Sequence, residues 1–301
     1  MKEIYFAGGC FWGVEHFFKG VDGVAEAMPG YANGNTENPT YKEVYTDTTG
    51  FAETVRVRYN PERVSLDFLT RMFFTVTDPL TLNRQGHDEG TRYRSGVFYV
   101  NEEDRSVIET VFQEVSAKLG VPLVTQLEPL RSFYPAEEYH QNYLDKNLEC
   151  YCHLSLKTFA YLRLYQDAKL YLGDEKDIVA RMANLCALIA KKMHFFWTGF
   201  YRVIDGELVL GPFQGPLACT RIARGRGVCG TTWQERRTLV VPDVHQFKGH
   251  IACSSASQSE IVVPVFRNGE IIAVLDIDSE HLSTFDDVDK EWLEKIVECF
   301  L

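Results

Sequence analysis

The sequence predicts an α+β protein of two domains: an α/β sandwich around a mixed sheet, followed by an antiparallel sheet flanked by helices. A chain of 301 residues exceeds one domain of ordinary size, so two domains with separate cores are the first expectation. In the first half, strand patterns interleave with helical ones, which is typical of an α/β sandwich. In the second half, two helical patterns precede a hairpin and further strands.

The elements of the first half follow from the spacing of its apolar residues. Apolar runs and alternation predict strands, 3.6-residue spacing predicts helices, and clusters of Gly, Pro and polar residues predict loops. The predicted strands lie at 4–7, in the later part of 49–59, at 96–100 and at 123–127; the predicted helices lie at 14–18, 66–74, 103–119 and from 134 onward; the predicted loops lie at 29–34 and 83–95.

The second half begins with helical patterns at 157–172 and 178–193, separated by a break at Gly173 and Asp174. A hairpin is expected around Asp205 and Gly206, and later strands at 238–241, 260–266 and 271–277, so a six-stranded antiparallel sheet fits this half. No spacer rich in Gly, Pro or Ser separates the halves. We therefore expect a short linker, with domains at 1–157 and 158–301.

Composition excludes several classes of protein. The formal net charge of −11 argues against nucleic acid as the main partner, because phosphate binding requires clustered Lys and Arg. Neither a signal peptide nor an apolar run long enough to cross a bilayer is present, so we expect a cytoplasmic protein. Without an export signal, the eight cysteines are expected to be catalytic, redox-active or buried rather than a disulfide framework.

Cys10 stands where a short strand runs into a helix, between Gly8-Gly9 and Phe11-Trp12. A thiol at a helix N-terminus faces unpaired N–H groups and the positive end of the dipole, which lowers its pKa. The alternative is an inert buried cysteine. The paired glycines, which permit a sharp turn, and the aromatic residues that follow favour a nucleophile.

Glu53 shares one face of an alternating strand with apolar residues such as Val55 and Val57. Alternation leaves two interpretations open. If Glu53 is buried, its pKa is raised and it donates a proton near neutral pH. If it lies at a strand edge in water, it has no such role.

The first half resembles the peptide methionine-(S)-sulfoxide reductases over residues 1 to about 155. The motifs that carry the resemblance are Gly-Gly-Cys-Phe-Trp-Gly at 8–13, Gly30-Tyr31, Pro39-Thr40-Tyr41, Thr49-Gly50 through Glu53, Asp88 with Gly90-Thr91, Tyr93-Arg94-Ser95 and Tyr139-His140-Gln141. The resemblance implies that the Cys10 sulfur attacks the sulfoxide and Glu53 protonates the leaving oxygen. It further implies that the following residues contribute: Tyr41 and Tyr93 hold that oxygen, Phe11 and Trp12 surround the methyl group, and Asp88 fixes the polar loop.

Attack by a thiolate leaves a sulfenic acid, which a second thiol must convert to a disulfide. The resemblance places Cys152 in that role, with Cys150 as the alternative. A zinc corner formed by Cys150, Cys152 and His153 is the competing interpretation, but no second ligand pair lies at suitable spacing.

In the second half, Gly225, Gly227 and Gly230 form a literal G-x-G-x-x-G. No strong strand precedes it and no βαβ unit surrounds it, so we reject a dinucleotide site. Three cysteines in polar, glycine-bearing loops, Cys219, Cys229 and Cys253, favour a shared redox pocket over separate core positions.

Glu260 opens a predicted strand, and Asp276 and Asp278 alternate on one face of another. These acids either hold an ammonium group and supply a proton, or lie at a solvated strand end.

Residues 160 to 301 resemble the free methionine-(R)-sulfoxide reductases, catalytic members of the GAF-domain superfamily. The motifs are 197–201, 210–215, 225–230, Asp243-Val244-His245, 249–253, Ser259-Glu260-Ile261 and 275–279. The resemblance implies Cys253 as the attacking thiolate, Cys219 as its disulfide partner and Cys229 as an auxiliary thiol. It also implies that Trp197 and Tyr201 form a pocket for the methyl group. The amino group and the sulfoxide would bind in an acidic subsite formed by Glu260, Asp276 and Asp278.

Together the resemblances imply one polypeptide with two methionine sulfoxide reductases of complementary stereochemistry. Neither is expected to need a metal or bound cofactor, and thioredoxin or a similar dithiol would supply electrons to repair oxidative damage. Two alternatives stay open. The second half is instead a non-catalytic GAF ligand sensor that regulates the first, or the chain is a peroxide-sensing thiol protein.

Overall fold

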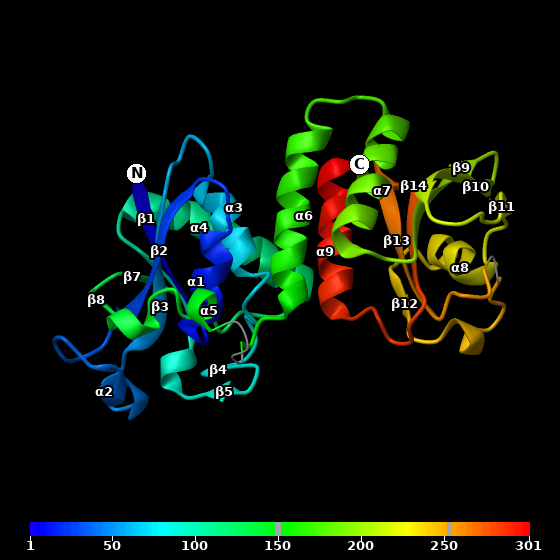
Figure 1. Ribbon diagram of the computed structural model, residues 1–301. Coiled ribbons are helices and arrows are strands. Elements are labelled where there is room, and N and C mark those ends of the chain that lie inside the picture. Colours follow the sequence, from blue (N-terminus) through cyan, green and yellow to red (C-terminus); the bar gives the residue numbers. More distant parts are fainter. Residues whose placement is uncertain (148–151, 252–253) are drawn as a thin grey trace. The chain divides into compact units, whose positions relative to one another are not determined.

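The structure is a computed structural model that describes residues 1–147, 152–251 and 254–301. The chain divides into two compact units, Met1–Ser155 and Leu156–Leu301 (Figure 1). Within the described residues, no helix combines the length and apolar character that a membrane span requires.

The first unit is built on a six-stranded sheet in the order β7-β6-β1-β3-β2-β8. Its strands are β1 (Lys2–Gly8), β2 (Val24–Ala32), β3 (Ala52–Tyr59), β6 (Ser95–Tyr99), β7 (Gln126–Pro129) and β8 (Phe133–Pro135), with a separate two-stranded ribbon of β4 (Arg84–Gln85) and β5 (Asp88–Glu89). β6 and β7 pair in parallel, whereas the other neighbours pair antiparallel. The predicted mixed sheet is confirmed.

Alternate residues of β1 pack on opposite sides of this sheet. Phe6 stacks on Phe18 and Phe73 at ring-centroid distances of 4.6 and 5.0 Å. Tyr5 lies in a second cluster with Phe98 and Phe133. The helices of the unit are α1 (Phe11–Lys19), α2 (Tyr41–Tyr45), α3 (Leu66–Phe73), α4 (Glu102–Leu119) and α5 (Tyr143–Lys146). The sheet therefore carries a core on each face, as the predicted sandwich requires.

Three local predictions for this unit are wrong. The loop expected at 29–34 is mostly strand, because its residues pair with β3 on one side and β8 on the other. The strand expected at 123–127 lies further on, as β7. The helix expected from Tyr134 is instead β8, a 3-10 turn at Glu138–His140 and α5. Tyr134 precedes Pro135, and a residue before proline favours extended backbone over helix. Asn142, with a φ of 55°, then interrupts the helical backbone.

The second unit is built on another six-stranded sheet, in the order β11-β10-β9-β14-β13-β12, with every neighbouring pair antiparallel. Its strands are β9 (Trp197–Ile204), β10 (Glu207–Gln214), β11 (Arg221–Ile222), β12 (Leu239–Val241), β13 (Ser259–Arg267) and β14 (Glu270–Ser279). The predicted antiparallel sheet is confirmed. Asp205 and Gly206 form the turn of the predicted hairpin, and both have positive φ, as a type I′ turn requires.

Helices flank this second sheet. They are α6 (Leu156–Leu172), α7 (Ile178–Met193), α8 (Gly227–Glu235) and α9 (Asp287–Phe300). α7 and α9 lie on one face, with α6 packed on both, whereas α8 covers the opposite face. Lys157 at the start of α6 donates to Asp289 of α9 at 2.5 Å, and Tyr161 donates to the same carboxylate at 2.8 Å. On the face covered by α8, a pocket lies between this helix and strands β13 and β14.

Candidate active sites

Cys10 lies where β1 ends and α1 begins, as the sequence predicts. Gly9 has a φ of +83°, and a Cβ there would lie 2.5 Å from Cβ of Gln85. Only glycine satisfies both the backbone conformation and this close approach. Cys10 occupies the N-cap position of α1 and its side chain is half-buried.

Glu53 of β3 is buried, with 2% of its surface exposed. Its Oε2 accepts a hydrogen bond from the Phe11 backbone N–H at 3.1 Å, in the first turn of α1. Burial raises the pKa of Glu53 to about 8, although the Phe11 hydrogen bond partly opposes this. The alternation of the strand left two interpretations of Glu53 open, and the structure confirms that the side chain is buried. The carboxyl group is therefore mostly protonated at neutral pH.

The prediction that the Cys10 pKa is lowered is wrong for this state of the protein. Burial raises the pKa of the Cys10 thiol well above its ordinary value, and the nearby Glu53 charge adds to the shift. A hydrogen bond from the Trp12 backbone N–H opposes the shift without cancelling it. The thiol and the carboxyl group therefore both hold their protons at rest.

Tyr41 and Tyr93 lie close enough to Glu53 to interact with its charge. Burial, and then the Glu53 charge, raises the pKa of both phenols, so both remain hydrogen-bond donors. Tyr41 opens α2, where its backbone N–H donates to Glu137 at 2.8 Å. The guanidinium of Arg92 lies 4.4 Å from the centre of the Tyr93 ring. The structure thus brings two phenols, a carboxyl group and a thiol into one site.

Phe11 and Trp12 pack around His140, to which the sequence assigned no role of its own. The Trp12 indole donates to His140 Nδ1 at 3.1 Å, and its ring stacks on Tyr143 at 3.7 Å. The ring of Phe11 lies 5.1 Å from His140 and that of Tyr41 lies 4.5 Å from it. His140 therefore positions aromatic residues from three segments. Its place in a motif at 139–141 is the one signal that the sequence offers.

Cys152 lies against the first turn of α1. Its sulfur accepts a hydrogen bond from the Leu154 N–H at 3.4 Å. A Cβ at Gly13 would lie 2.8 Å from that sulfur, so the glycine makes room for it. Burial raises the pKa of Cys152, and its charge contributes to the shift of Cys10. Cys150, the alternative resolving residue, lies outside the described residues.

Asp88 lies in β5, part of the short ribbon beside the site. One of its carboxylate oxygens is buried without a hydrogen-bond partner among the described residues, 4.0 Å from Nδ1 of His153. Burial lowers the pKa of His153 to about 4, so the ring is neutral. His153 is a second buried residue of this site to which the sequence assigned no function in catalysis.

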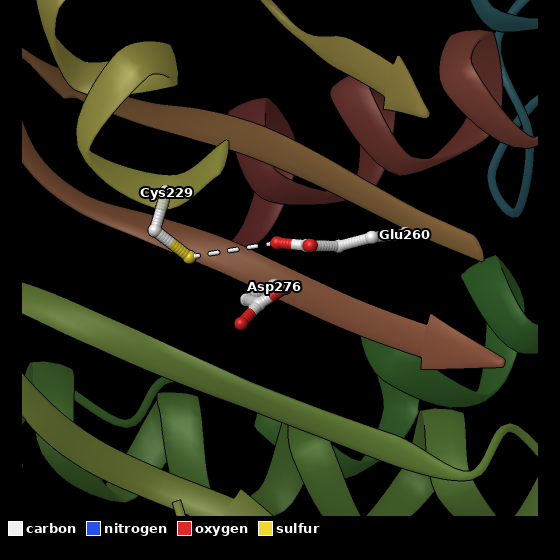
Figure 2. A group of neighbouring side chains, drawn as sticks. All are labelled: Cys229, Glu260 and Asp276. Atoms are coloured by element: carbon white, nitrogen blue, oxygen red, sulfur yellow. Dashed lines mark hydrogen bonds between the residues drawn. The ribbon is translucent and has the colours of Figure 1, made fainter. Parts of the chain in front are cut away.

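In the second unit, Cys229, Glu260 and Asp276 converge from three elements (Figure 2). Their ligand atoms all lie within 4.8 Å of one another, and Cys229 Sγ lies 4.0 Å from Glu260 Oε1. Cys229 belongs to helix α8, which corrects the prediction that it lies in a glycine-bearing loop. Gly227 begins α8 with a positive φ, which explains why the local sequence looks like a loop.

The acids of this cluster are buried rather than solvated. Burial raises the pKa of Cys229, Glu260 and Asp276 well above their ordinary values, and the neighbouring charges add to each shift. Burial raises the pKa of Asp278 to about 6, against a hydrogen bond from Ser257. The solvated strand end considered for these acids is therefore wrong.

Trp197 and Tyr201 line the same pocket as the cluster and Asp278. Their ring centroids lie 6.0 Å apart, and the Trp197 indole donates to the Pro216 carbonyl at 3.1 Å. Cys219 follows Leu217 and Ala218, which also line the pocket, and it is disulfide-bonded. The predicted attacking residue, Cys253, lies outside the described residues. Apart from Cys219 and Cys253, the residues predicted for this site line one pocket.

Comparison with known proteins gives matches for each half. Residues 2–169 match the peptide methionine sulfoxide reductase family, and residues 175–298 match the GAF domain family. The chain is 53% identical over 154 residues to a peptide methionine sulfoxide reductase MsrA of Clostridium acetobutylicum, covering 51% of this chain and 95% of the relative. It is 52% identical over 142 residues to GAF domain-containing protein A of Dictyostelium discoideum, covering 47% of this chain and 90% of that protein.

A solved structure, the free methionine-R-sulfoxide reductase of Neisseria meningitidis in complex with its substrate, is 48% identical to the matched part of the chain. The match covers 49% of this chain and 89% of that one, with a TM-score of 0.48.

Proposed function

The chain belongs to the peptide methionine sulfoxide reductase family and carries a GAF domain in its second half, and from this premise we propose that it holds two methionine sulfoxide reductases. The first unit reduces S-sulfoxide in peptides and in the free amino acid. The second unit reduces the R-sulfoxide of free methionine. The observation that carries the proposal is that each unit has a free thiol beside a buried carboxyl group whose pKa burial raises.

In the first unit, the sulfur of Cys10 attacks the sulfoxide sulfur while Glu53 gives its proton to the sulfoxide oxygen. The S–O bond of the substrate breaks, the oxygen passes to Cys10 as a sulfenic acid, and the sulfide leaves. Glu53 regains a proton from the Cys10 thiol, so the acid is restored. The substrate sulfur is reduced by two electrons and the Cys10 sulfur is oxidised by two.

The surrounding residues have separate tasks in this step. Tyr41 and Tyr93 donate hydrogen bonds to the oxygen as it gains negative charge, because their raised pKa keeps both hydroxyls protonated. Phe11 and Trp12 pack against the methyl group, and Asp88 holds the ribbon beside the site. His140 keeps the two aromatic rings in place.

Cys152 then attacks the sulfur of the Cys10 sulfenic acid. A disulfide forms, the S–O bond breaks, and hydroxide leaves as water with the proton of the Cys152 thiol. The position of Cys152 against Gly13, one turn from Cys10, supports this role. Thioredoxin or another small dithiol reduces the disulfide and restores both thiols.

In the second unit, Cys253 attacks the sulfoxide and Cys219 resolves the sulfenic acid as a disulfide, with Cys229 as an auxiliary thiol. The disulfide at Cys219 supports its resolving role. Glu260, Asp276 and Asp278 bind the substrate ammonium and protonate the departing oxygen, and Trp197 and Tyr201 pack against the methyl group. The described residues that line this pocket include no lysine and no arginine, which favours a cationic substrate group.

The test separates the two activities. Cys10→Ser and Cys253→Ser variants of the full chain are assayed with free R- and S-sulfoxide and a dithiol reductant. We expect Cys10→Ser to abolish only S-sulfoxide reduction and Cys253→Ser to abolish only R-sulfoxide reduction, with Cys186→Ser, a buried core thiol, as the control. Loss of both activities in Cys10→Ser would favour the regulatory GAF alternative, and oxidation of Cys10 without sulfoxide consumption would favour a peroxide sensor.

A further inference from the structure

Cys229, Glu260 and Asp276 form a cluster of one sulfur and two carboxyl groups. The described residues that line the adjoining pocket include no lysine or arginine. The three residues come from α8, β13 and β14, so tertiary packing rather than one flexible loop holds them together. All are buried, with 3%, 6% and 7% of their surfaces exposed. Figure 2 shows the Cys229 sulfur directed toward the two acids.

A second observation concerns one oxygen of Asp276. Oδ1 of Asp276 is buried and has no hydrogen-bond partner among the described residues. An unpartnered carboxylate oxygen in a buried place is costly unless a proton or a cation compensates it. The adjoining cavity measures about 40 Å³, room for roughly three waters. A small ion with its remaining waters fits there.

The donor set selects the kind of cation. A thiolate with two carboxylates suits a borderline or soft divalent ion such as Zn²⁺, whereas Mg²⁺ and Ca²⁺ prefer oxygen alone. Zinc bonds of roughly 2.0–2.3 Å place ligands about 3.3–3.8 Å apart around a tetrahedral ion. The donor atoms lie within 4.8 Å of one another. Shifts of about 1 Å in the side chains would therefore bring all three atoms to zinc-bonding distance, and the fourth coordination position would face the pocket.

We propose that Cys229, Glu260 and Asp276 bind a thiophilic divalent cation, Zn²⁺ or Cd²⁺, through one sulfur and two oxygens. Binding displaces the thiol proton and the carboxyl protons to solvent, so affinity rises with pH. The ion occupies the acidic subsite that the proposed function assigns to the substrate ammonium. The cation is therefore a competitive inhibitor of R-sulfoxide reduction, a consequence that rests on the proposed function, whereas cation binding itself does not.

The experiment uses the full chain in a Cys10→Ser background, which removes the first-unit thiol pair as a competing site. Co²⁺ is the spectroscopic probe, because thiolate ligation gives a charge-transfer absorption. Zn²⁺ affinity is measured by competition with a chromophoric chelator. We expect one equivalent of Co²⁺ with the charge-transfer band, displaced by Zn²⁺.

The variants decide the assignment. Cys229→Ser is expected to lose the charge-transfer band, and Asp276→Asn to weaken Zn²⁺ binding by about tenfold or more. Cys186→Ser, which removes another buried free thiol, is expected to bind as the background protein does. Thermal unfolding checks that each variant is folded, and the near-isosteric Asp276→Asn decides the matter if Cys229→Ser is unfolded.

A band that persists unchanged in Cys229→Ser, equal Zn²⁺ affinity in Asp276→Asn, or no bound cation at all would overturn the proposal. R-sulfoxide reduction is measured in the same samples with and without Zn²⁺. Cation binding in a protein without R-sulfoxide activity would refute the proposed function of the second unit and leave the cation site standing. Activity without cation binding would do the reverse.

Discussion

The two candidate sites differ in how their buried carboxyl groups are stabilised. Glu53 is fully buried beside Cys10, with the part-buried Asp88 near both, and a backbone N–H from the start of α1 partly stabilises the charged form of Glu53. Glu260, Asp276 and Asp278 lie together around Cys229, and each raises the pKa of a neighbour. The first site has one fully buried acid with a hydrogen bond, whereas the second has several buried acids that repel one another.

This difference matches two kinds of substrate. A sulfoxide inside a peptide is neutral, so a site for it needs one proton donor and an apolar surface for the methyl group. A free amino acid carries an ammonium, so a site for it gains from carboxylates that have no other cation. The contrast therefore predicts that charge on the substrate, and not only its stereochemistry, separates the two activities.

Removal of the single acid should give the largest effect. Glu53→Gln keeps the shape of the side chain but has no carboxyl proton to donate, so we expect kcat for S-sulfoxide reduction to fall by about 10²–10⁴-fold. R-sulfoxide reduction should not change. Glu62→Gln, at an exposed position, is the matched control. A Glu53→Gln variant with near-normal single-turnover rates would remove Glu53 from the mechanism.

The acidic cluster should respond to the substrate ammonium. Asp276→Asn removes one carboxyl group that can pair with the ammonium, and we expect KM for free R-sulfoxide to rise about 10–100-fold, as loss of a charged hydrogen bond implies. N-acetylation of the substrate removes the ammonium instead, and should lower the activity of the second unit without lowering that of the first. If both units accept the acetylated substrate equally, the comparison between the sites fails.

Sequence patterns predicted those features that depend on local periodicity. The helix expected at 178–193 is α7, Ile178–Met193, because the Asp177 side chain caps its start and His194, in the left-handed conformation, ends it. The shared face of Asp276 and Asp278 follows from alternation in β14 alone. The family resemblances also named every residue around the second pocket that the mechanism uses.

Features that depend on tertiary burial could not be predicted in this way. The helix dipole at Cys10 is local and lowers the thiol pKa, but burial by distant segments outweighs it. Likewise, no spacing in the sequence places Cys229 against Glu260, because the docking of α8 on β13 and β14 brings them together. His140 contacts Phe11 and Trp12 across almost the whole first unit. The roles assigned to individual site residues stay predictions.

The pH dependence should differ in direction between the units. Glu53, with a pKa of about 8, loses its proton above that pH, so kcat/KM for S-sulfoxide should fall about tenfold from pH 7 to pH 9. Asp278, with a pKa of about 6, gains a proton below that pH, so binding of the R-sulfoxide ammonium should weaken there. Single-turnover rates avoid the pH dependence of the reductant. A common pH profile for both activities would contradict the contrast.

The smallest effect concerns the second thiol of the first unit. In Gly13→Ala the new Cβ would meet the Cys152 sulfur at 2.8 Å, and side chains of His153 and Leu154 at 3.2 Å each, so the sulfur must shift away from α1. Such overpacking costs about 1 kcal/mol or more, which is roughly fivefold in a rate. We expect a normal first burst of sulfide as Cys10 reduces the substrate, because that step does not use Cys152. Disulfide formation, which does use Cys152, is expected to slow about fivefold.

Quenched-flow measurement of sulfide and of remaining thiols separates the two steps. An equal slowing of both would mean that the added methyl group distorts the start of α1, while no slowing of either would mean that Cys152 does not resolve Cys10 from the position beside Gly13.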